Sequence, residues 1–211
     1  MKRFRIHYEQ TGNLIYVSVL EIQKIWERAC RRAGFQLVFS QGFHPQPKIQ
    51  ILLPLPLGIF GLDEKVDIWF QENIKFDELK QGLSTKLPHG ISIKQVEAIN
   101  LSEKSLVNKI EYADYLIEFF PDLLIPDSKN LEAKISTILE SQEVIRTRRG
   151  KKYNLRSLIE DIQYVQSQHG RDQIYLKMLA KPGKTGRPDE VINELGFDLT
   201  QCKIYRTKIY Y

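Results

Sequence analysis

The strongest pattern in the sequence is an amphipathic helix with recognisable ends. Its apolar residues recur every three or four positions, as Ile22, Ile25, Trp26, Ala29, Cys30 and Ala33. Ser18 and Glu21 have the spacing of a capping box, in which each side chain accepts from the other residue's backbone N–H. Gly34 follows as a residue that adopts the left-handed conformation of a helix end without strain. The sequence therefore predicts a helix over residues 18–33, with Trp26 in the core.

Strands are expected on both sides of this helix, because several segments alternate apolar and polar residues or are continuously apolar. The predicted strands cover residues 4–8, 35–40, 48–58, 64–71 and 90–99. A second, shorter helix is predicted over residues 76–88. The order strand, helix, strand, strand, helix, strand, with one extra strand, indicates the split βαββαβ or ferredoxin-like plan.

A polar stretch over residues 100–108 is a candidate domain boundary, and a similar order of elements follows it. The predicted elements are a strand at 112–120, a helix at 131–141, a hairpin turning at 149–151, a strand at 173–180, a helix at 187–196 and a strand at 203–211. We therefore expect an α+β protein with two ferredoxin-like sandwich domains packed side by side. The domains would cover residues 1–100 and 109–211.

Composition excludes several classes of site. The only two cysteines, Cys30 and Cys202, cannot form a disulfide framework, a zinc site or an iron–sulfur cluster within one chain. The four histidines have no metal-ligand spacing, so we expect no metal and no cofactor. No signal-like or membrane-length apolar run is present, which favours a cytoplasmic protein with no membrane partner. The net charge of +5 permits an RNA partner without requiring one.

Basic residues gather in the second half, and Lys2, Arg3 and Arg5 open the chain. The hairpin and the Gly/Pro loop near residue 184 carry the candidate phosphate contacts Arg146, Arg148, Arg149, Lys151, Lys152, Arg156, Lys184 and Arg187. Cations with an adjacent aromatic residue such as Tyr153 fit RNA phosphates and unpaired bases. A hairpin tip that is merely solvated would have a similar composition, and this alternative stays open.

The segment Ser40–Lys48 (SQGFHPQPK) has the composition of a recognition loop. Gly42 permits unusual backbone, and two prolines stiffen the loop so that binding orders little more of it. Its candidate contacts are Ser40, Gln41, Phe43, His44, Gln46 and Lys48. The alternative is a structural turn in which Phe43 fills the core and His44 caps a strand. His44 is also a weak candidate for general acid–base catalysis, because no carboxylate in the loop orients it.

Several motifs together resemble a known family. They are ERACRRAG at 27–34, SQGFHPQPK at 40–48, LPLG at 55–58, GRPDEVINELG at 186–196 and YRTKIYY at 205–211. The chain resembles the radical-SAM-linked domain of unknown function, a bacterial family found alone or fused behind a B12-binding radical SAM protein. It departs from that pattern at Val19 and Glu21, where the family usually has His and Asp, and near Arg156, where flanking Asp and Pro are missing. The resemblance implies a radical SAM partner.

These observations favour a non-catalytic RNA-recognition or accessory module that works with a radical SAM RNA-modifying enzyme or with RNA-processing machinery. The RNA would be a tRNA or a ribosomal RNA. One alternative is a metal-independent endoribonuclease or RNA-modifying enzyme that uses His44. A second alternative is a protein-binding scaffold that presents the same loop to a partner enzyme.

Overall fold

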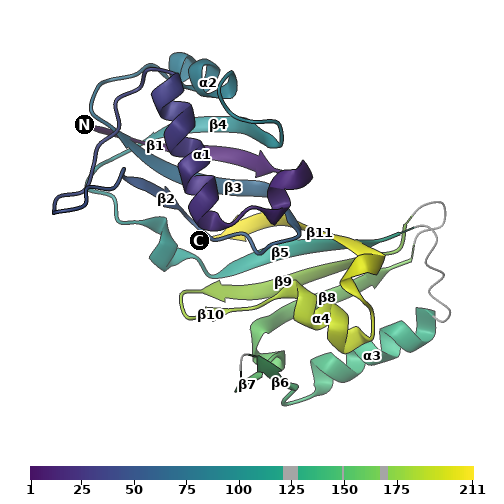
Figure 1. The fold of residues 1–211 in the computed structure, drawn as a ribbon. Helices are drawn as coiled ribbons and strands as arrows, with labels where there is room; N and C mark the ends of the chain where they lie inside the picture. Colours follow the sequence, from purple (N-terminus) through teal and green to yellow (C-terminus); the bar gives the residue numbers. More distant parts are fainter. Residues whose placement is uncertain (121–127, 149, 167–170) are drawn as a thin grey trace. The chain divides into compact units, whose positions relative to one another are not determined.

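The chain forms two compact α+β units. The computed structural model describes residues 1–120, 128–148, 150–166 and 171–211 of the 211-residue chain (Figure 1). Unit 1 covers Met1–Val107 and unit 2 covers Asn108–Tyr211. In the described residues no helix is both long enough and apolar enough to cross a membrane.

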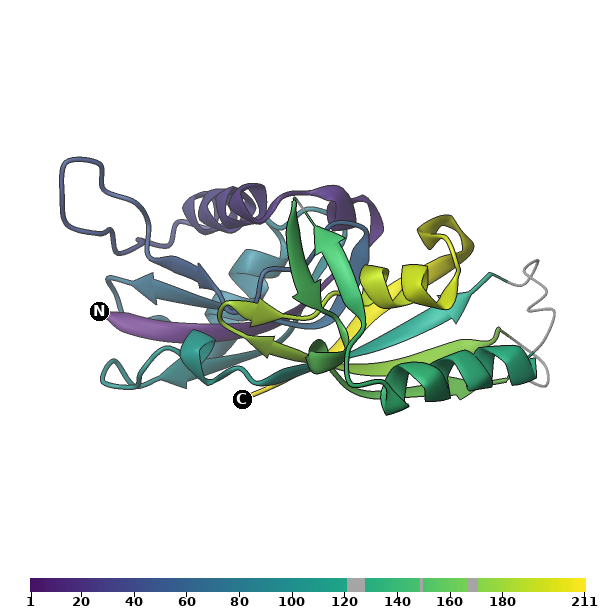
Figure 2. The same cartoon turned by 90° about the horizontal axis from the view of Figure 1, so that it is seen from below.

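Unit 1 is a four-stranded antiparallel sheet with two helices against one face. Its elements are β1 (Lys2–Gln10), α1 (Val19–Arg32), β2 (Ile49–Ile51), β3 (Ile59–Phe70), α2 (Phe76–Ser84) and β4 (Ile91–Ile99). The strands lie in the order β4-β1-β3-β2. Figure 2 shows α1 over the sheet, and the core between them includes Ile6, Ile68 and, from α2, Leu83.

The prediction of the first helix is confirmed, because its signals are local. The backbone N–H of Glu21 donates to Ser18 Oγ, and the backbone N–H of Ser18 donates to the Glu21 carboxylate, which completes the capping box. Trp26 is fully buried and packs edge-on against Tyr8, with ring centroids 5.1 Å apart. The helix therefore buries its apolar stripe against β1.

The strands expected around the recognition loop are much shorter than predicted. Residues 35–40 make only isolated bridges, such as Leu37 with Phe70, and β2 ends at Ile51. Pro54 and Pro56 lack the N–H that a continued ladder needs, which explains why the apolar run 48–58 does not pair along its length. In contrast, β3 begins earlier than expected and extends from Ile59.

The main strands of unit 2 are also antiparallel, and two further strands form a separate hairpin. Its elements are β5 (Tyr112–Phe119), α3 (Ser128–Glu140), β6 (Ile145–Arg148), β7 (Lys151–Asn154), β8 (Ile159–Val165), β9 (Gln173–Lys181), β10 (Lys184–Thr185), α4 (Pro188–Leu195) and β11 (Cys202–Tyr210). The main strands lie in the order β11-β5-β9-β8. The short β10 also pairs with β9, and β6 pairs only with β7.

Most predicted elements of this half are confirmed, including the hairpin and the helix with Pro188 at its start and Gly196, at φ +90°, after its end. The prediction missed β8. Its register with β9 shifts between Ile159 and Asp161, so the buried residues Ile159 and Ile162 are three positions apart. This bulge conceals the two-residue alternation by which a strand is recognised.

Candidate nucleic-acid-binding site

The β6–β7 hairpin sorts its cations onto two faces. Arg146 lies opposite Tyr153, and Arg148 lies opposite Lys151. Residues that pair directly, and residues two apart along a strand, share a face of a hairpin. These four side chains therefore share one face, whereas Lys152 belongs to the other. Arg149, another predicted contact, lies outside the described residues.

Arg146 anchors the hairpin to α4. Its Nε donates to Glu190 Oε2 at 3.3 Å, and its Nη1 donates to Glu194 Oε2 at 3.1 Å. Tyr153 is also hydrogen-bonded to Glu190; burial, followed by the charge and hydrogen bond of this carboxylate, raises the pKa of the phenol. The hairpin is thereby held beside α4, where it stands out from the sheet (Figure 2).

Arg156 is likewise occupied within the fold. Its Nε donates to the carbonyl oxygen of Leu139 at 3.0 Å, and its Nη1 donates to the carbonyl oxygen of Ile159 at 2.8 Å. These bonds join the end of α3 to the start of β8. The guanidinium groups of Arg146 and Arg156 thus hold the unit together, although both residues were predicted as phosphate contacts.

The loop from β9 to α4 supplies the other cations. Pro182 and Gly183 form its turn, and Gly183 has φ +78°, which favours glycine. Arg187 precedes α4 and pairs with Asp189 through two nitrogens, with Nε–Oδ1 at 2.9 Å and Nη2–Oδ2 at 2.6 Å. Burial opposes the charged form, but the hydrogen bonds and charge of Asp189 outweigh it, so the pKa of Arg187 is raised.

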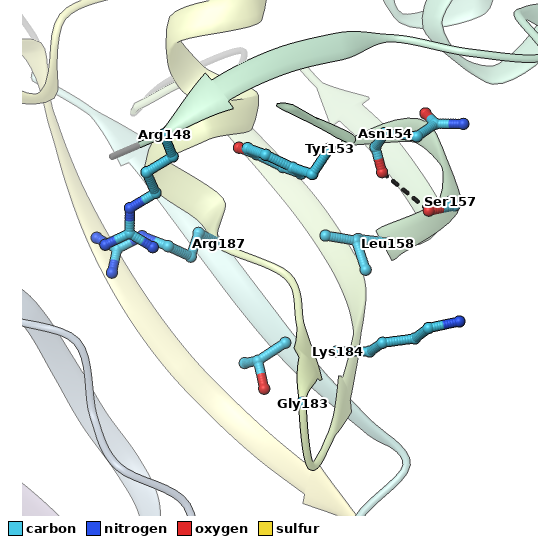
Figure 3. Close-up of a pocket in the computed structure, with 9 residues that line it drawn as sticks. Arg148, Tyr153, Asn154, Ser157, Leu158, Gly183, Lys184 and Arg187 are labelled. Atoms are coloured by element: carbon cyan, nitrogen blue, oxygen red, sulfur yellow. Dashed lines mark hydrogen bonds between the residues drawn. The ribbon is translucent and has the colours of Figure 1, made fainter. Parts of the chain in front are cut away.

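The hairpin and this loop enclose a pocket of about 310 Å³, which we call the basic pocket (Figure 3). It is lined by Arg148, Tyr153, Asn154, Ser157, Leu158, Gly183, Lys184, Thr185 and Arg187. In Figure 3, the guanidinium groups of Arg148 and Arg187 extend toward one end of the pocket, whereas the Lys184 side chain extends toward the other. The Tyr153 ring and Leu158 lie between these ends. Cations at two ends of an apolar wall suit a ligand that is both anionic and planar.

Three of the predicted cations therefore meet at one pocket, and the structure adds residues that the sequence did not single out. Ser157 Oγ donates to the carbonyl oxygen of Asn154 at 2.8 Å, and Thr185 Oγ1 donates to that of Lys181 at 3.2 Å. Both hydroxyl oxygens can still accept a hydrogen bond. Small polar residues are common in loops, so no sequence signal distinguishes these two.

The other predicted cations that the structure describes are not used to hold the fold together. Within the described residues, Arg148, Lys151, Lys152 and Lys184 make no hydrogen bond or ion pair. Arg148 and Lys151 are directly opposite across the hairpin, where like charges destabilise a strand pair. A bound anion would relieve this repulsion on the face that the pocket uses.

The recognition loop of unit 1 projects from its sheet in both views (Figures 1 and 2). The N–H of Ser40 donates to the carbonyl oxygen of Gln46 at 2.8 Å, and the N–H of Gln46 donates to Ser40 Oγ at 2.9 Å. These bonds close the loop. They also occupy hydrogen-bonding groups of Ser40 and Gln46, two of the predicted contact residues. The Phe43 side chain is 102% exposed, so the alternative in which it fills the core is wrong.

The loop presents most of its predicted contact residues to solvent. Gln41, Phe43, His44 and Lys48 are all exposed. Within the described residues, His44 makes no hydrogen bond or ion pair, and no cluster of metal-ligating side chains is present. Nothing in the described chain orients the His44 imidazole as a general base, and the ring of the neighbouring Phe43 is fully exposed.

Two of the three basic residues at the N-terminus are buried, whereas Lys2 is exposed. Arg3 and Arg5 are 3% exposed, and both pair with the buried carboxylate of Asp67. The Arg3 guanidinium also stacks over Trp69 and donates to the carbonyl oxygen of Glu103. These two cations belong to the interior of unit 1.

Comparisons with known proteins identify the family of this chain. A family model described as "Uncharacterized protein conserved in bacteria (DUF2344)" matches residues 3–188. No curated protein matches. One similar solved chain comes from the "Crystal structure of the archaeal box H/ACA sRNP Nop10-Cbf5 complex", with a TM-score of 0.43 and 10% identity. That match covers 97% of this chain but 47% of the other, and so distant a likeness carries no inference about function.

Proposed function

This chain belongs to the DUF2344 family of uncharacterized bacterial proteins, and we propose that it is a non-catalytic RNA-recognition module serving an RNA-modifying or RNA-processing enzyme. The observation that carries the proposal is the basic pocket, which is lined by Arg148, Lys184 and Arg187 together with the ring of Tyr153. Single-stranded RNA offers both complementary features, because its phosphates attract cations and its unpaired bases stack on aromatic faces.

The recognition loop supports the same proposal as a second contact surface. Phe43 presents a fully exposed ring, and Lys48 lies at the loop's end. Pro45 and Pro47 restrict the backbone between them, so less conformational entropy is lost when a ligand binds. The loop would contact bases and sugars, while the basic pocket and Lys151 would contact phosphates.

The resemblance to the radical-SAM-linked domain leads us to propose a radical SAM enzyme as the partner. The partner would hold the iron–sulfur cluster, because this chain has only two cysteines. We also interpret each unit as a ferredoxin-like sandwich. Support comes from the matching strand orders β4-β1-β3-β2 and β11-β5-β9-β8, each with a helix in both crossovers.

Binding of a labelled single-stranded RNA, measured by fluorescence anisotropy, tests the proposal. Affinity should fall steeply between about 50 and about 200 mM salt, because bound cations displace counterions. Arg148→Ala should weaken binding more than Lys152→Ala, since Lys152 lies on the other face of the hairpin. No measurable affinity at the lower salt would overturn the proposed function, and equal effects of the two substitutions would count against the pocket.

The full exposure of Phe43 also favours a second candidate function, a scaffold that binds a partner enzyme directly. An exposed aromatic ring on a stiff loop can anchor a protein interface. Co-purification of a partner that survives nuclease and high salt, and that Phe43→Ser abolishes, would favour this function over the first. Loss of the partner after nuclease treatment alone would exclude it.

A further inference from the structure

We propose that the basic pocket holds one unpaired nucleotide from within an RNA strand, with its base against Tyr153 and Leu158 and its two flanking phosphates at opposite ends. This inference rests on the proposed function and specifies what the pocket recognises. It follows from the size of the pocket, its fixed aromatic wall and the separation of its cations.

The pocket is small. Its volume of about 310 Å³ lies at the lower limit for ligand pockets, which usually span about 300–1,000 Å³. A single base with its sugar fits a pocket of this size. A base pair is too wide to enter it, so neither of its bases could stack on the Tyr153 ring. The pocket therefore selects a nucleotide that is unpaired or turned out of a helix.

The aromatic wall is held in place before any ligand arrives. Tyr153 lies opposite Arg146 in the hairpin, and both side chains contact Glu190 of α4. Because the ring is positioned by two elements, stacking a base on it requires little further ordering of the protein. A flexible surface tyrosine would lose more conformational freedom for the same contact.

The cations of the basic pocket lie at its two ends. Arg148 and Arg187 extend toward one end, and Lys184 extends toward the other (Figure 3). Asp189 fixes the Arg187 guanidinium through Nε and Nη2, and Nη1 makes no hydrogen bond within the described residues. A terminal or free nucleotide with one phosphate would leave one end unused. A nucleotide inside a strand has a phosphate on each side and can use both.

Nucleotide titration into the full chain by calorimetry tests this arrangement. The probes are adenosine, its 5′- and 3′-monophosphates and adenosine 3′,5′-bisphosphate. The bisphosphate should bind about tenfold more tightly than either monophosphate, because each phosphate gains hydrogen bonds to a charged donor. The bisphosphate should also displace a labelled single-stranded RNA. Equal affinities of the bisphosphate and the monophosphates would overturn the inference.

Two matched pairs of variants locate the contacts. In Lys184→Gln, the bisphosphate should bind no more tightly than one of the monophosphates. Lys181→Gln should retain the preference for the bisphosphate, because Lys181 pairs with Lys184 across β9–β10 but does not line the pocket. Tyr153→Leu should weaken the bisphosphate about tenfold through lost stacking, and Tyr153→Phe should retain most of the affinity. Melting curves would show that each variant is folded.

The outcomes separate this inference from the proposed function. If RNA binds but Tyr153→Leu and Lys184→Gln leave RNA and bisphosphate affinities unchanged, the pocket inference is wrong and the RNA-recognition proposal stands. If neither RNA nor any nucleotide binds, both proposals are wrong. If the bisphosphate binds as expected but single-stranded RNA does not, the pocket serves a free nucleotide, which also overturns the inference.

Discussion

At the scale of single residues, the clearest feature is Asp67, a fully buried carboxylate between two arginines. Arg3 Nε donates to Oδ2 at 3.0 Å, and Arg5 Nε donates to Oδ1 at 2.9 Å. Sequence composition places these arginines among the basic residues that could reach RNA. The structure shows instead that β3 supplies their counter-charge, and no local pattern in the first residues of the chain reveals this.

Asp67→Asn should destabilise the protein by about 3–5 kcal/mol, because two buried guanidinium groups would lose the carboxylate charge that they share. Urea unfolding followed by circular dichroism measures the change. Glu103→Gln is the matched control, because its main-chain oxygen still accepts a hydrogen bond from Arg3. Its side chain is exposed, so this substitution should change the free energy of unfolding by less than about 0.5 kcal/mol. Equal midpoints for the two variants would contradict this account of the buried cluster.

Both cysteines should be unreactive in the folded protein. Burial raises the pKa of Cys30 from 9.0 to about 12 and that of Cys202 from 9.0 to about 11. Since only the thiolate reacts, a thiol reagent at about pH 8 should label neither residue until denaturant is added. Rapid labelling of native protein would disprove this.

These raised pKa values also predict how stability changes in alkali. Above pH 9 an unfolded chain loses its thiol protons first, while the native state retains them until about pH 11–12. The free energy of unfolding should therefore decline as pH rises through this window. Cys30→Ala should reduce that decline even if it lowers stability at neutral pH.

At the scale of elements, the outcome of prediction depends on whether the signal is local. The capping box and apolar stripe lie within the helix itself, so the sequence alone predicts α1. The strand β8 and the short β2 depend on a bulge against β9 and on prolines that interrupt pairing. Likewise, the cations of the candidate site could be predicted as a group, but their division into structural and free ones could not. This division depends on contacts that the arginines make with α3 and α4.

Ser18→Ala tests the cap of α1 and should cost about 1 kcal/mol, because the backbone N–H of Glu21 loses its acceptor. The hydrogen bonds from Ser18 lower the pKa of Glu21, so the cap contributes fully above the ordinary carboxyl pKa and weakens as pH falls. The variant should therefore show less acid dependence of unfolding. Ser102→Ala, on an exposed loop, is the control and should change little.

At the scale of the whole molecule, the two units repeat one arrangement of strands, and unit 2 adds to it. The β6–β7 hairpin and the short β10 have no counterpart in unit 1, and together they supply most of the lining of the basic pocket. In unit 1 the corresponding addition is the recognition loop. Each unit thus combines the same order of four main strands, which provides stability, with added segments that present cations or an aromatic ring.

This separation predicts that stability and RNA binding respond to different arginines of the same hairpin. Arg146→Ala should lower the free energy of unfolding by about 1–2 kcal/mol, because Glu190 and Glu194 lose a partly buried charged partner. Arg148→Ala should leave stability within about 0.5 kcal/mol of the parent. Within the described residues, Arg148 contributes no hydrogen bond or ion pair.

For RNA, the ranking of the two variants should reverse. Arg148→Ala removes one phosphate contact, so the slope of log affinity against log salt should become shallower by about 0.7 for a single strand. Arg146→Ala should leave this slope unchanged under conditions where it remains folded, because its guanidinium is already paired with α4. If both variants reduce the slope equally, the hairpin attracts RNA only through its total charge. The distinction between its anchoring and its ligand-facing arginines would then have no part in binding.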